Sequence, residues 1–383
     1  MTERQAWIAL ASVVGVGEET MVFLVSEFRS AQAVLAAALD GSLNAWNVAK
    51  GRQLDRVPIP ARVMAGIDAV ARNPQTKLDA IADMGMWTYT SFDPDYPARL
   101  RDLDPPPAVI HGLGDQSLLS RPRAVAVVGT RRPTPAGRAL TTKISVRLVE
   151  CDAVVVSGLA VGIDGAAHAA AVEREGPTVG VIGAGHLQPG PRAHARLRDE
   201  ILATGGALIS EHHPKVTATR GTYPRRNRII AALGDATIVV EAPRKSGALI
   251  TANHALELGR PVFVAPGRIG DWAMAGSLAL LRDTPARPIV GMDELAEDLG
   301  YLTSATPAGA TVTGTRDAAL QMLGTSERAV AERLCAGPCG LDVLTAETGL
   351  PPGAISSAVT LLLMRGWAQP LGPAYIAAGP LAR

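Results

Sequence analysis

The stretch Val125-Ala-Val-Val-Gly-Thr-Arg131 is a short apolar run that ends at a glycine, and this arrangement returns along the centre of the chain. Similar runs end at Ser157-Gly158, at Gly183 and at Glu241. Continuous β-branched runs, unlike alternating ones, indicate strands that are buried on both faces of a parallel sheet. The strands are expected at 125–128, 153–156, 178–182, 236–240 and 261–265.

Helical segments fill the intervals between these strands, which suits the right-handed crossovers of a parallel sheet. At 383 residues the chain is too long for one ordinary domain, so further domains are expected on either side. The pattern predicts an α/β fold with an extended Rossmann-like, doubly wound and mostly parallel sheet over residues 86–300. Its helices are expected at 137–150, 165–175, 193–204 and 251–258.

Residues 1–85 are expected to form a small helical domain of the SAM or helix-hairpin-helix kind. Short helices at 6–10 and 21–28 flank the turn Val13-Val-Gly-Val-Gly17. Hairpins of this kind can present backbone N–H groups to phosphate. Here Glu18 and Glu19 follow the turn, and their negative charge favours a packing role over contact with DNA.

A winged-helix domain is expected at 317–383, after a Thr-, Ala- and Gly-rich linker at 301–316. Its helices are predicted at 326–334, 342–347 and 353–364, before a strand-like tail at 367–377. A transcriptional regulator would use such a domain to read duplex DNA. However, the helix 353–364 has no charged residue, and from Ala318 onward four acidic residues balance four basic ones. Contact with a protein is therefore favoured over reading of duplex DNA.

The composition excludes several classes of protein. Three cysteines cannot supply a disulfide framework for a chain of this size, and Cys335 and Cys339 have no nearby Cys or His pair to complete a zinc site. The chain does not begin with a basic segment and an apolar run, and no stretch approaches the ~18 uncharged apolar residues of a membrane span. We therefore expect a cytoplasmic protein without a metal, a cofactor or a membrane partner.

Positive charge is concentrated in one segment between two expected strands. The stretch His212–Arg228, HHPKVTATRGTYPRRNR, carries five positive side chains and no carboxylate, although the net charge of the chain is only +1. Such a run is stable in a folded domain only where solvent or an anionic partner surrounds it. It also contains Tyr223, and basic residues interleaved with an aromatic ring suit a phosphodiester chain with a stacked base. Nucleic acid is therefore the first partner indicated.

Three strand-end loops add to this signal, because ligands of an open parallel sheet bind beyond the carboxyl ends of its strands. Gly129-Thr-Arg131 combines a small residue with a guanidinium that can fork onto phosphate oxygens. Ser157-Gly158 precedes a helix whose free N–H groups can bind an anion. Lys245-Ser-Gly247 again places a cation at a helix start. A single such glycine is more often simple turn geometry, but with the basic run these loops predict one anion-binding edge.

Nucleotide-binding and catalytic signatures are weak or missing. The spacing of Gly158 and Gly162 does not match a dinucleotide fingerprint, and the chain has no Walker sequence for ATP. Asp164 and His168 could pair as a base and its orienting group, or Asp164 could cap the helix while His168 packs locally. Glu241 could act as a general base or balance a nearby Arg or Lys. Because no nucleophile with a matched base appears, the residues favour a binding protein over an enzyme.

Five motifs occur in a fixed order along the chain. They are Val127-Val-Gly-Thr-Arg131, Ser157-Gly-Leu-Ala-Val-Gly-Ile-Asp164 with Ala167-His168, Ser210-Glu211, Tyr223-Pro-Arg-Arg-Asn-Arg228, and Ser246-Gly-Ala-Leu-Ile-Thr-Ala252 with Pro266-Gly267. In this order they resemble the DprA/Smf family, DNA-processing protein A. The resemblance is close from about Phe92 to Arg282, and the flanking domains fit the family's usual arrangement.

The resemblance implies a protein that binds and protects single-stranded DNA, forms a homodimer through its Rossmann-like domain and loads a RecA-type recombinase during natural transformation. Phosphates would lie over the three strand-end loops, and bases would stack on Tyr223 or lie across the basic run. Arg220, Arg225 and Arg228 are the expected phosphate ligands of that run, with Asn227 fixing its turn. The implied DNA-binding residues are Gly129, Thr130, Arg131, Ser157, Gly158, Arg220, Tyr223, Arg225, Asn227, Arg228, Lys245, Ser246 and Gly247.

The chain departs from the family pattern at several places. Val161 stands where an arginine is common, His186-Leu-Gln-Pro-Gly190 replaces a Tyr-Pro pair, and Gly276-Ser-Leu278 lacks an asparagine. A rival interpretation is a nucleotide-processing enzyme of related Rossmann-like fold, of the phosphoribohydrolase type. Those enzymes need a Pro-Gly-Gly-x-Gly-Thr loop, which Ser246–Thr251 does not provide.

Overall fold

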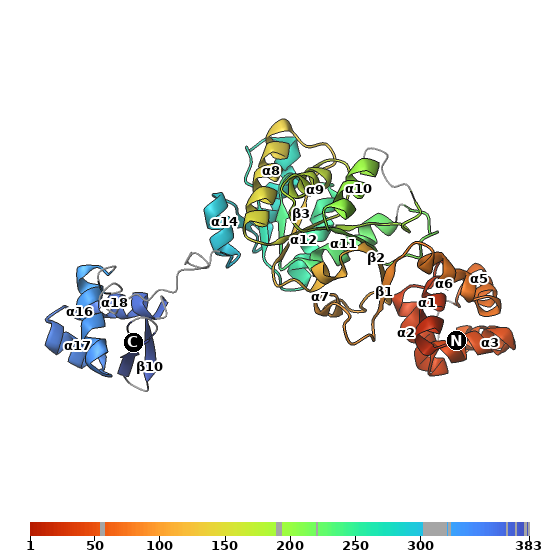
Figure 1. Cartoon of the computed structure of the whole chain (residues 1–383), viewed down its shortest axis with the longest axis horizontal. Helices are drawn as coiled ribbons and strands as arrows, with labels where there is room; N and C mark the ends of the chain where they lie inside the picture. Colours follow the sequence, from red (N-terminus) through yellow and green to blue (C-terminus); the bar gives the residue numbers. More distant parts are fainter. Residues whose placement is uncertain are drawn as a thin grey trace. The chain divides into compact units, whose positions relative to one another are not determined.

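The computed structural model divides into two compact units, Met1–Leu302 and Thr303–Arg383 (Figure 1). The expected linker at 301–316, apart from Tyr301, lies outside the described residues, as do Arg220 and the Pro189-Gly190 part of the family departure. The structure describes residues 1–53, 58–188, 194–219, 221–301, 320, 323–364, 367–371, 374–378 and 381.

A nine-stranded sheet lies at the centre of the first unit, within the described ranges. Its order is β1-β2-β6-β5-β4-β3-β7-β8-β9; the strands from β6 to β9 are parallel, and β1 and β2 are antiparallel. The strands are β1 (Trp87–Thr90), β2 (Val109–Gly114), β3 (Ala124–Val128), β4 (Val154–Ser157), β5 (Thr178–Val181), β6 (Ala207–Ser210), β7 (Ala236–Val239), β8 (Val262–Val264) and β9 (Arg287–Pro288).

The five predicted strands are confirmed as β3, β4, β5, β7 and β8. The prediction leaves out β1, β2, β6 and β9. β6 lies inside the sheet but is only the four residues Ala-Leu-Ile-Ser, of which one is β-branched. β1 is Trp-Thr-Tyr-Thr, β2 contains His111 and Gly112, and β9 has only two residues, so none of them is a continuous β-branched run. β1 and β9 are the two edge strands of the sheet, where burial on both faces is not required, and β2 lies next to β1.

Helices cover both faces of the sheet, which confirms the doubly wound fold (Figure 1). Those on one face are α8 (Pro135–Glu150), α9 (Ile163–Glu173) and α14 (Met292–Asp298). Those on the other are α7 (Ala98–Arg101), α11 (Thr222–Leu233), α12 (Gly247–Glu257) and α13 (Ala275–Asp283). α10 (Ala195–Ala203) packs beside α9 and β6.

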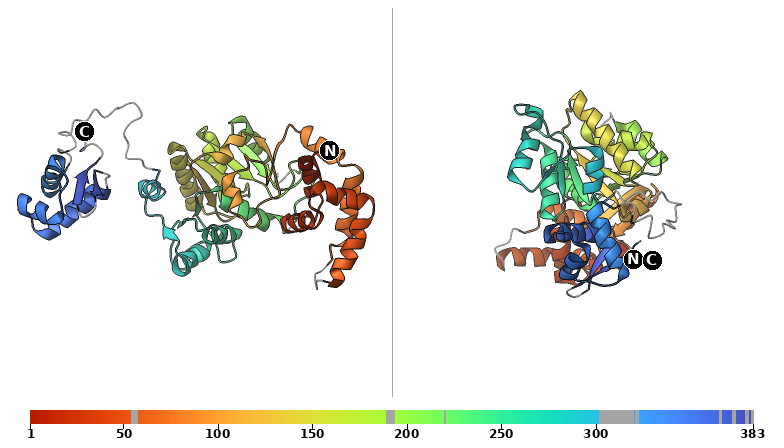
Figure 2. Two further views of the ribbon diagram at one scale, coloured as in Figure 1. Left: turned by 90° about the horizontal axis from the view of Figure 1, so that it is seen from below. Right: turned by 90° about the vertical axis from the view of Figure 1, so that its left-hand side faces the viewer.

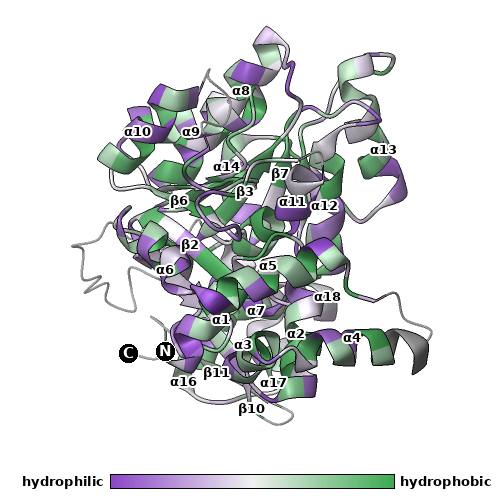
Figure 3. Ribbon diagram, turned by 90° about the vertical axis from the view of Figure 1, so that its right-hand side faces the viewer, coloured by the Kyte–Doolittle hydropathy of each residue, from purple (hydrophilic) through white to green (hydrophobic). Residues whose placement is uncertain are grey.

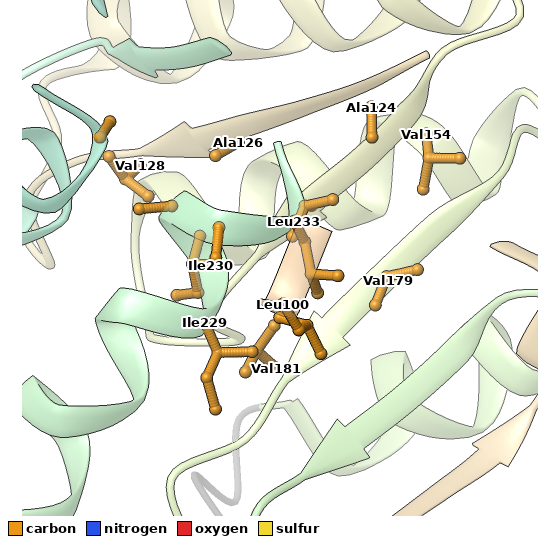
Figure 4. Close-up of a cluster of buried hydrophobic side chains, with 14 of the residues drawn as sticks. Leu100, Ala124, Ala126, Val128, Val154, Val179, Val181, Ile229, Ile230 and Leu233 are labelled. Atoms are coloured by element: carbon orange, nitrogen blue, oxygen red, sulfur yellow. The ribbon is translucent and has the colours of Figure 1, made fainter. Parts of the chain in front are cut away.

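The strand β3 shows why a continuous apolar run belongs in the middle of this sheet. Successive side chains of a strand point to opposite faces. Ala126 and Val128 pack against α11 (Figure 4), and Val125 and Val127 pack on the opposite face with α8 and α9. Figure 3 accordingly shows hydrophobic colouring along the central strands and hydrophilic colouring on outer helices such as α10.

A bundle of short helices precedes the sheet and has its own core. It lies beside the sheet edge formed by β1 and β2 (Figure 2). Trp7 donates its indole N–H to the Ala108 carbonyl at 2.8 Å, and Arg4 pairs with Asp93 at 3.0 Å. The helices are α1 (Glu3–Ala11), α2 (Glu18–Phe28), α3 (Ala31–Leu39), α4 (Ser42–Gln53), α5 (Ala61–Arg72) and α6 (Gln75–Ala82).

No single helix in the described part of the chain has the length and apolarity to cross a membrane, and the pair α2 and α3 reaches that length only across an 80° bend.

A buried ion-pair network joins the helical bundle to α11. Glu18, at the start of α2, pairs with both Arg225 and Arg228, and Arg228 also pairs with Glu211 at 2.5 Å. The side chains of Glu18 and Glu211 are only 8% and 5% exposed. The packing role predicted for the hairpin is therefore confirmed, because its acidic residue binds arginines of the protein itself.

The second unit has the layout of a winged helix, as predicted. Its helices pack around Val330, Leu344 and Leu362, and its two strands form an antiparallel hairpin. Cys339 forms an isolated bridge with Tyr375 of this hairpin. The elements are α16 (Thr325–Ala336), α17 (Leu341–Thr348), α18 (Pro352–Met364), β10 (Ala368–Leu371) and β11 (Ala374–Ala377).

Replacing Glu18 by alanine is expected to lower the free energy of unfolding by about 1.5–3 kcal/mol, because Arg228 then loses one of its two carboxylates and keeps only Glu211. Urea unfolding followed by tryptophan fluorescence measures the change. The neighbouring Glu19 is exposed, so Glu19→Ala is the matched control and should unfold like the wild type. Equal stabilities of the two variants would contradict the docking role of Glu18.

Candidate nucleic-acid interface

The strand order reverses at β3: the chain adds β4, β5 and β6 on one side of it and β7, β8 and β9 on the other. A large pocket lies at this point. β3 is hydrogen-bonded to β4 on one side and to β7 on the other. The chain leaves β3 and β7 toward different faces of the sheet, so their carboxyl-end loops separate and leave a crevice. The pocket in this crevice has a volume of about 810 Å³, and we call it the switch pocket. Its walls include Gly129–Arg132, Lys245–Ala248 and the first turn of α11.

Asp164 ties the loops beneath this pocket together. Its carboxylate accepts the Gly158 N–H at 3.1 Å and also receives the N–H groups of Gly129 and Ala160. Burial raises the pKa of Asp164, while the positive charge of Arg226 and the three N–H groups oppose that rise. One carboxylate thus joins the loop after β3 to the loop after β4.

Arg226 is the buried cation of the site. It is 3% exposed, and its guanidinium donates to the carbonyl groups of Gly158 and Val181 and to the Asn227 side chain. These contacts connect α11 to the carboxyl ends of β4 and β5. A Cβ on Gly158 would lie 2.4 Å from the nearest guanidinium nitrogen, so a glycine is needed here for close packing.

Glu241 supports the loop after β3. Its carboxylate accepts the N–H and hydroxyl of Thr134, and its backbone carbonyl accepts the Thr130 N–H at 2.7 Å. Within the described residues Glu241 therefore pairs with no Arg or Lys, and its carboxylate is bound to Thr134 and not free in the pocket as a general base would be, contrary to both sequence interpretations. It instead fixes the start of α8 against the end of β7.

Arg131 and Tyr223 stand at the junction of two pockets. The exposed guanidinium of Arg131 lies over the Tyr223 ring, 5.7 Å from its centroid. Both residues line the switch pocket and a second pocket of about 280 Å³ beyond β4 and β5. Gly158 and Val161 line only this smaller pocket. A cation and an aromatic face are thus offered together at the place where the two cavities meet.

Lys245, Ser246 and Gly247 also line the switch pocket, at the start of α12. The Ser246 hydroxyl accepts the Ala248 N–H at 3.3 Å and so caps the helix. Lys245 is exposed. The Gly247 carbonyl accepts the Asn227 side chain at 3.1 Å, which connects α12 to α11.

The structure separates several residues that the sequence interpretation grouped together. Ser157 is fully buried and donates its hydroxyl to the Val127 carbonyl, so this side chain does not face the pocket. Arg225 and Arg228 lie outside the switch pocket, where they pair with Glu18. Asn227 lies within the helix α11 and does not fix a turn. The basic run was not predicted to form a helix, and this is why its residues were placed on one wall.

The catalytic pairing considered for Asp164 and His168 is not formed. His168 is fully buried, and its Nδ1 lies 2.8 Å from the Thr178 hydroxyl, which itself donates to the Val155 carbonyl. Burial lowers the pKa of His168 to about 3. Asp164 binds loop N–H groups, as described above, and does not cap its own helix. Within the described ranges, no group of three or more His, Cys, Asp or Glu side chains could hold a metal ion.

Two residues of the site were missed by the sequence analysis. Arg226 was counted as one charge among five, and because Arg225 and Asn227 flank it, the sequence did not mark it as buried. Trp272, in a short 3-10 helix after β8, lines the switch pocket and is 64% exposed. Trp272 is one of only five tryptophans in the chain and follows the charged residue Asp271, which was the only signal available.

The chain thus combines an α/β crevice, with arginine, lysine and aromatic side chains along its lining, and a winged-helix unit. Residues 87–300 match the family described as DNA recombination-mediator protein A, and residues 314–372 match the DprA winged helix domain. The chain therefore belongs to the DprA/Smf family, as its motifs indicated.

Two relatives illustrate the similarity. The chain is 39% identical to the DNA processing protein DprA of Bacillus subtilis over 222 residues, which is 58% of this chain and 74% of the relative. It is 38% identical to the putative DNA processing protein DprA of Mycobacterium tuberculosis over 277 residues, 71% of this chain and 69% of the relative.

Two solved structures are similar as well. That of DNA processing protein A from Helicobacter pylori, described for its single-stranded DNA binding mode, has 29% identity and a TM-score of 0.51, covering 56% of this chain and 95% of that one. The DprA structure from Streptococcus pneumoniae has 31% identity and a TM-score of 0.54, covering 69% and 95%.

Replacing Arg226 by methionine is expected to lower the free energy of unfolding by about 3–5 kcal/mol, because Asp164 then keeps a buried charge without its cation. Urea unfolding measures this loss. Arg132 lines the same pocket but is exposed, so Arg132→Met should leave the stability unchanged. If Arg226→Met unfolds like Arg132→Met, Arg226 does not hold the loops together.

Proposed function

We propose that this protein binds single-stranded DNA in the switch pocket and the smaller pocket beside it. The observation that carries the proposal is the pair of Arg131 and Tyr223 at the junction of the two cavities, with the exposed Lys245 lining the same switch pocket. Cations can hold successive phosphates, and an aromatic face can stack an unpaired base. A base that is paired in a duplex does not offer its face in this way, so the arrangement favours a single strand.

The loops supply positions for phosphate oxygens without requiring a particular base. The exposed guanidinium of Arg131 and the N-terminus of α12, with Lys245 just before it, both line the switch pocket. Backbone N–H groups and a lysine recognise phosphate but carry no sequence information. Trp272 adds a second exposed ring at the pocket mouth. We therefore expect binding with little dependence on sequence.

Family membership extends this proposal to partners. We propose that two copies associate through the Rossmann-like domain, and that the protein protects an incoming strand and delivers it to a RecA-type recombinase. The α18 helix of the winged-helix unit has no charged side chain, which suits a protein contact better than the phosphates of a duplex. No catalytic step is part of the proposal.

The DNA preference is tested by gel-shift titration of single-stranded and double-stranded oligomers of one sequence across a range of salt concentrations. The single strand is expected to bind more tightly at every salt concentration, because only its bases are free to stack. Tighter binding to the duplex would overturn the proposed function.

Replacing Arg131 by alanine is expected to weaken binding to single strands of every sequence. It should also reduce the slope of log affinity against log salt by about 0.7, the value for one neutralised phosphate. Fluorescence anisotropy at several salt concentrations measures both quantities. Arg174 is exposed and lines neither pocket, so Arg174→Ala is the matched control. An unchanged affinity and slope in Arg131→Ala would show that the strand does not pass over this residue.

A further inference from the structure

A third cavity lies between the helical bundle and the sheet. It has a volume of about 540 Å³ and is lined by the hairpin Val13–Glu18, by Lys77 of α6 and by residues around Lys215. Thr219 lines both this cavity and the switch pocket. Lys215 and Thr219 are four residues apart and therefore span at most about 14 Å of chain. The two cavities are thus neighbours along one surface.

The charged residues at this third cavity fall into two groups. Glu18 and Glu211 are held by Arg225 and Arg228, so two carboxylates balance two guanidinium groups. Lys77 and Lys215 are additional, and within the described ranges neither forms an ion pair. Two positive charges without a carboxylate therefore face a cavity whose other charges are neutralised.

His213 holds the two lysines together. Its ring is buried, with Nε2 3.2 Å from the Lys77 carbonyl and Nδ1 3.3 Å from the Lys215 N–H. Nε2 therefore donates and Nδ1 accepts, which requires the neutral ring. Burial, with the charges of both lysines, lowers the pKa of His213 to about 4, so the ring is neutral at pH 7. The backbone on either side of the cavity is fixed to this one side chain.

This arrangement brings like charges together at a cost. Burial and the nearby Lys215 both lower the pKa of Lys77. Two ammonium groups repel one another, and their proximity becomes favourable when an anion lies between them. A lysine ammonium is a mobile point charge with three donors, which suits a phosphate oxygen without demanding a fixed plane.

We propose that Lys77 and Lys215 form a second phosphate-binding site that receives a phosphate of the DNA strand after the strand leaves the switch pocket. This inference rests on the proposed function, because the strand supplies the phosphate. The path runs from the switch pocket past Thr219 to the seam between the helical bundle and the sheet. The bundle then contributes a ligand, Lys77, to the bound strand, although its own hairpin is acidic.

Oligomer length separates the second site from the first. Fluorescence anisotropy would compare a short oligothymidylate of about 6 nucleotides, which fills the switch pocket, with a long one of about 20. In the double variant K77A/K215A, the salt slope for the long oligomer should fall by about 1.4, the value for two phosphate contacts. The short oligomer should bind like the wild type. Lys143 is exposed on α8, and Lys143→Ala is the matched control for loss of a lysine.

Conservative replacement and thermal unfolding test whether the weaker binding of K77A/K215A comes from a loss of folding and not from the loss of two charges. K77R/K215R should restore the slope for the long oligomer, and the thermal midpoint of K77A/K215A should stay that of the wild type. Wild-type binding of both oligomers by K77A/K215A would overturn the inference, and so would an equal loss for both lengths. If wild-type protein binds neither oligomer, the proposed function is wrong. The DNA strand is then also excluded as the source of the phosphate at Lys77 and Lys215.

Two further measurements distinguish other anions from the strand. In calorimetry, inorganic phosphate should bind far more weakly than the long oligomer. Loss of phosphate binding in K77A/K215A, with wild-type affinity for the long oligomer, would assign the pair to a free anion and overturn the inference. A hexaglutamate peptide whose binding requires the two lysines, again with unchanged DNA affinity, would assign them to an acidic protein segment and also overturn it.

Discussion

The buried guanidinium of Arg226 is the interaction on which the site depends. It reaches from α11 to the carboxyl ends of β4 and β5, and its charge offsets that of Asp164, which in turn holds the loop after β3. A charge buried away from water costs free energy unless its polar atoms find partners. Here carbonyl and N–H groups of the loops are those partners. Loops that are otherwise mobile connections are thereby fixed relative to one another, as a binding site requires.

Much of this could be predicted from the sequence because burial on both faces leaves a direct mark. β3, β4, β5, β7 and β8 are continuous apolar runs, and their order along the chain implies the parallel sheet. The position of the site could be predicted as well, because the carboxyl ends of parallel strands lie at one edge of the sheet. Gly129, Arg131, Tyr223 and Lys245 were predicted for this edge, and the structure brings them to the switch pocket.

The roles of the individual arginines could not be predicted, because they depend on the direction in which each side chain leaves the helix α11. A count of charges along the sequence does not contain that direction. The run from Tyr223 to Arg228 was interpreted as a loop with one exposed wall. In the structure it forms the first turns of α11, so its successive residues point in different directions. Arg226 enters the core, whereas Arg225 and Arg228 meet Glu18, a partner about two hundred residues away in the sequence. Pairing over such a separation leaves no local pattern.

Every side of the first turns of α11 makes a contact that the site or the fold needs. Tyr223 lines the two pockets, and Arg226 binds the strand-end loops. Asn227 binds the start of α12, and Arg228 binds Glu18 of the N-terminal bundle. Each residue of an α-helix is rotated by about 100° from the one before it, given 3.6 residues per turn. An inserted or deleted residue within α11 would therefore exchange these assignments, and it would turn a charge into the core. The contacts of these four residues therefore fix the helical phase of α11.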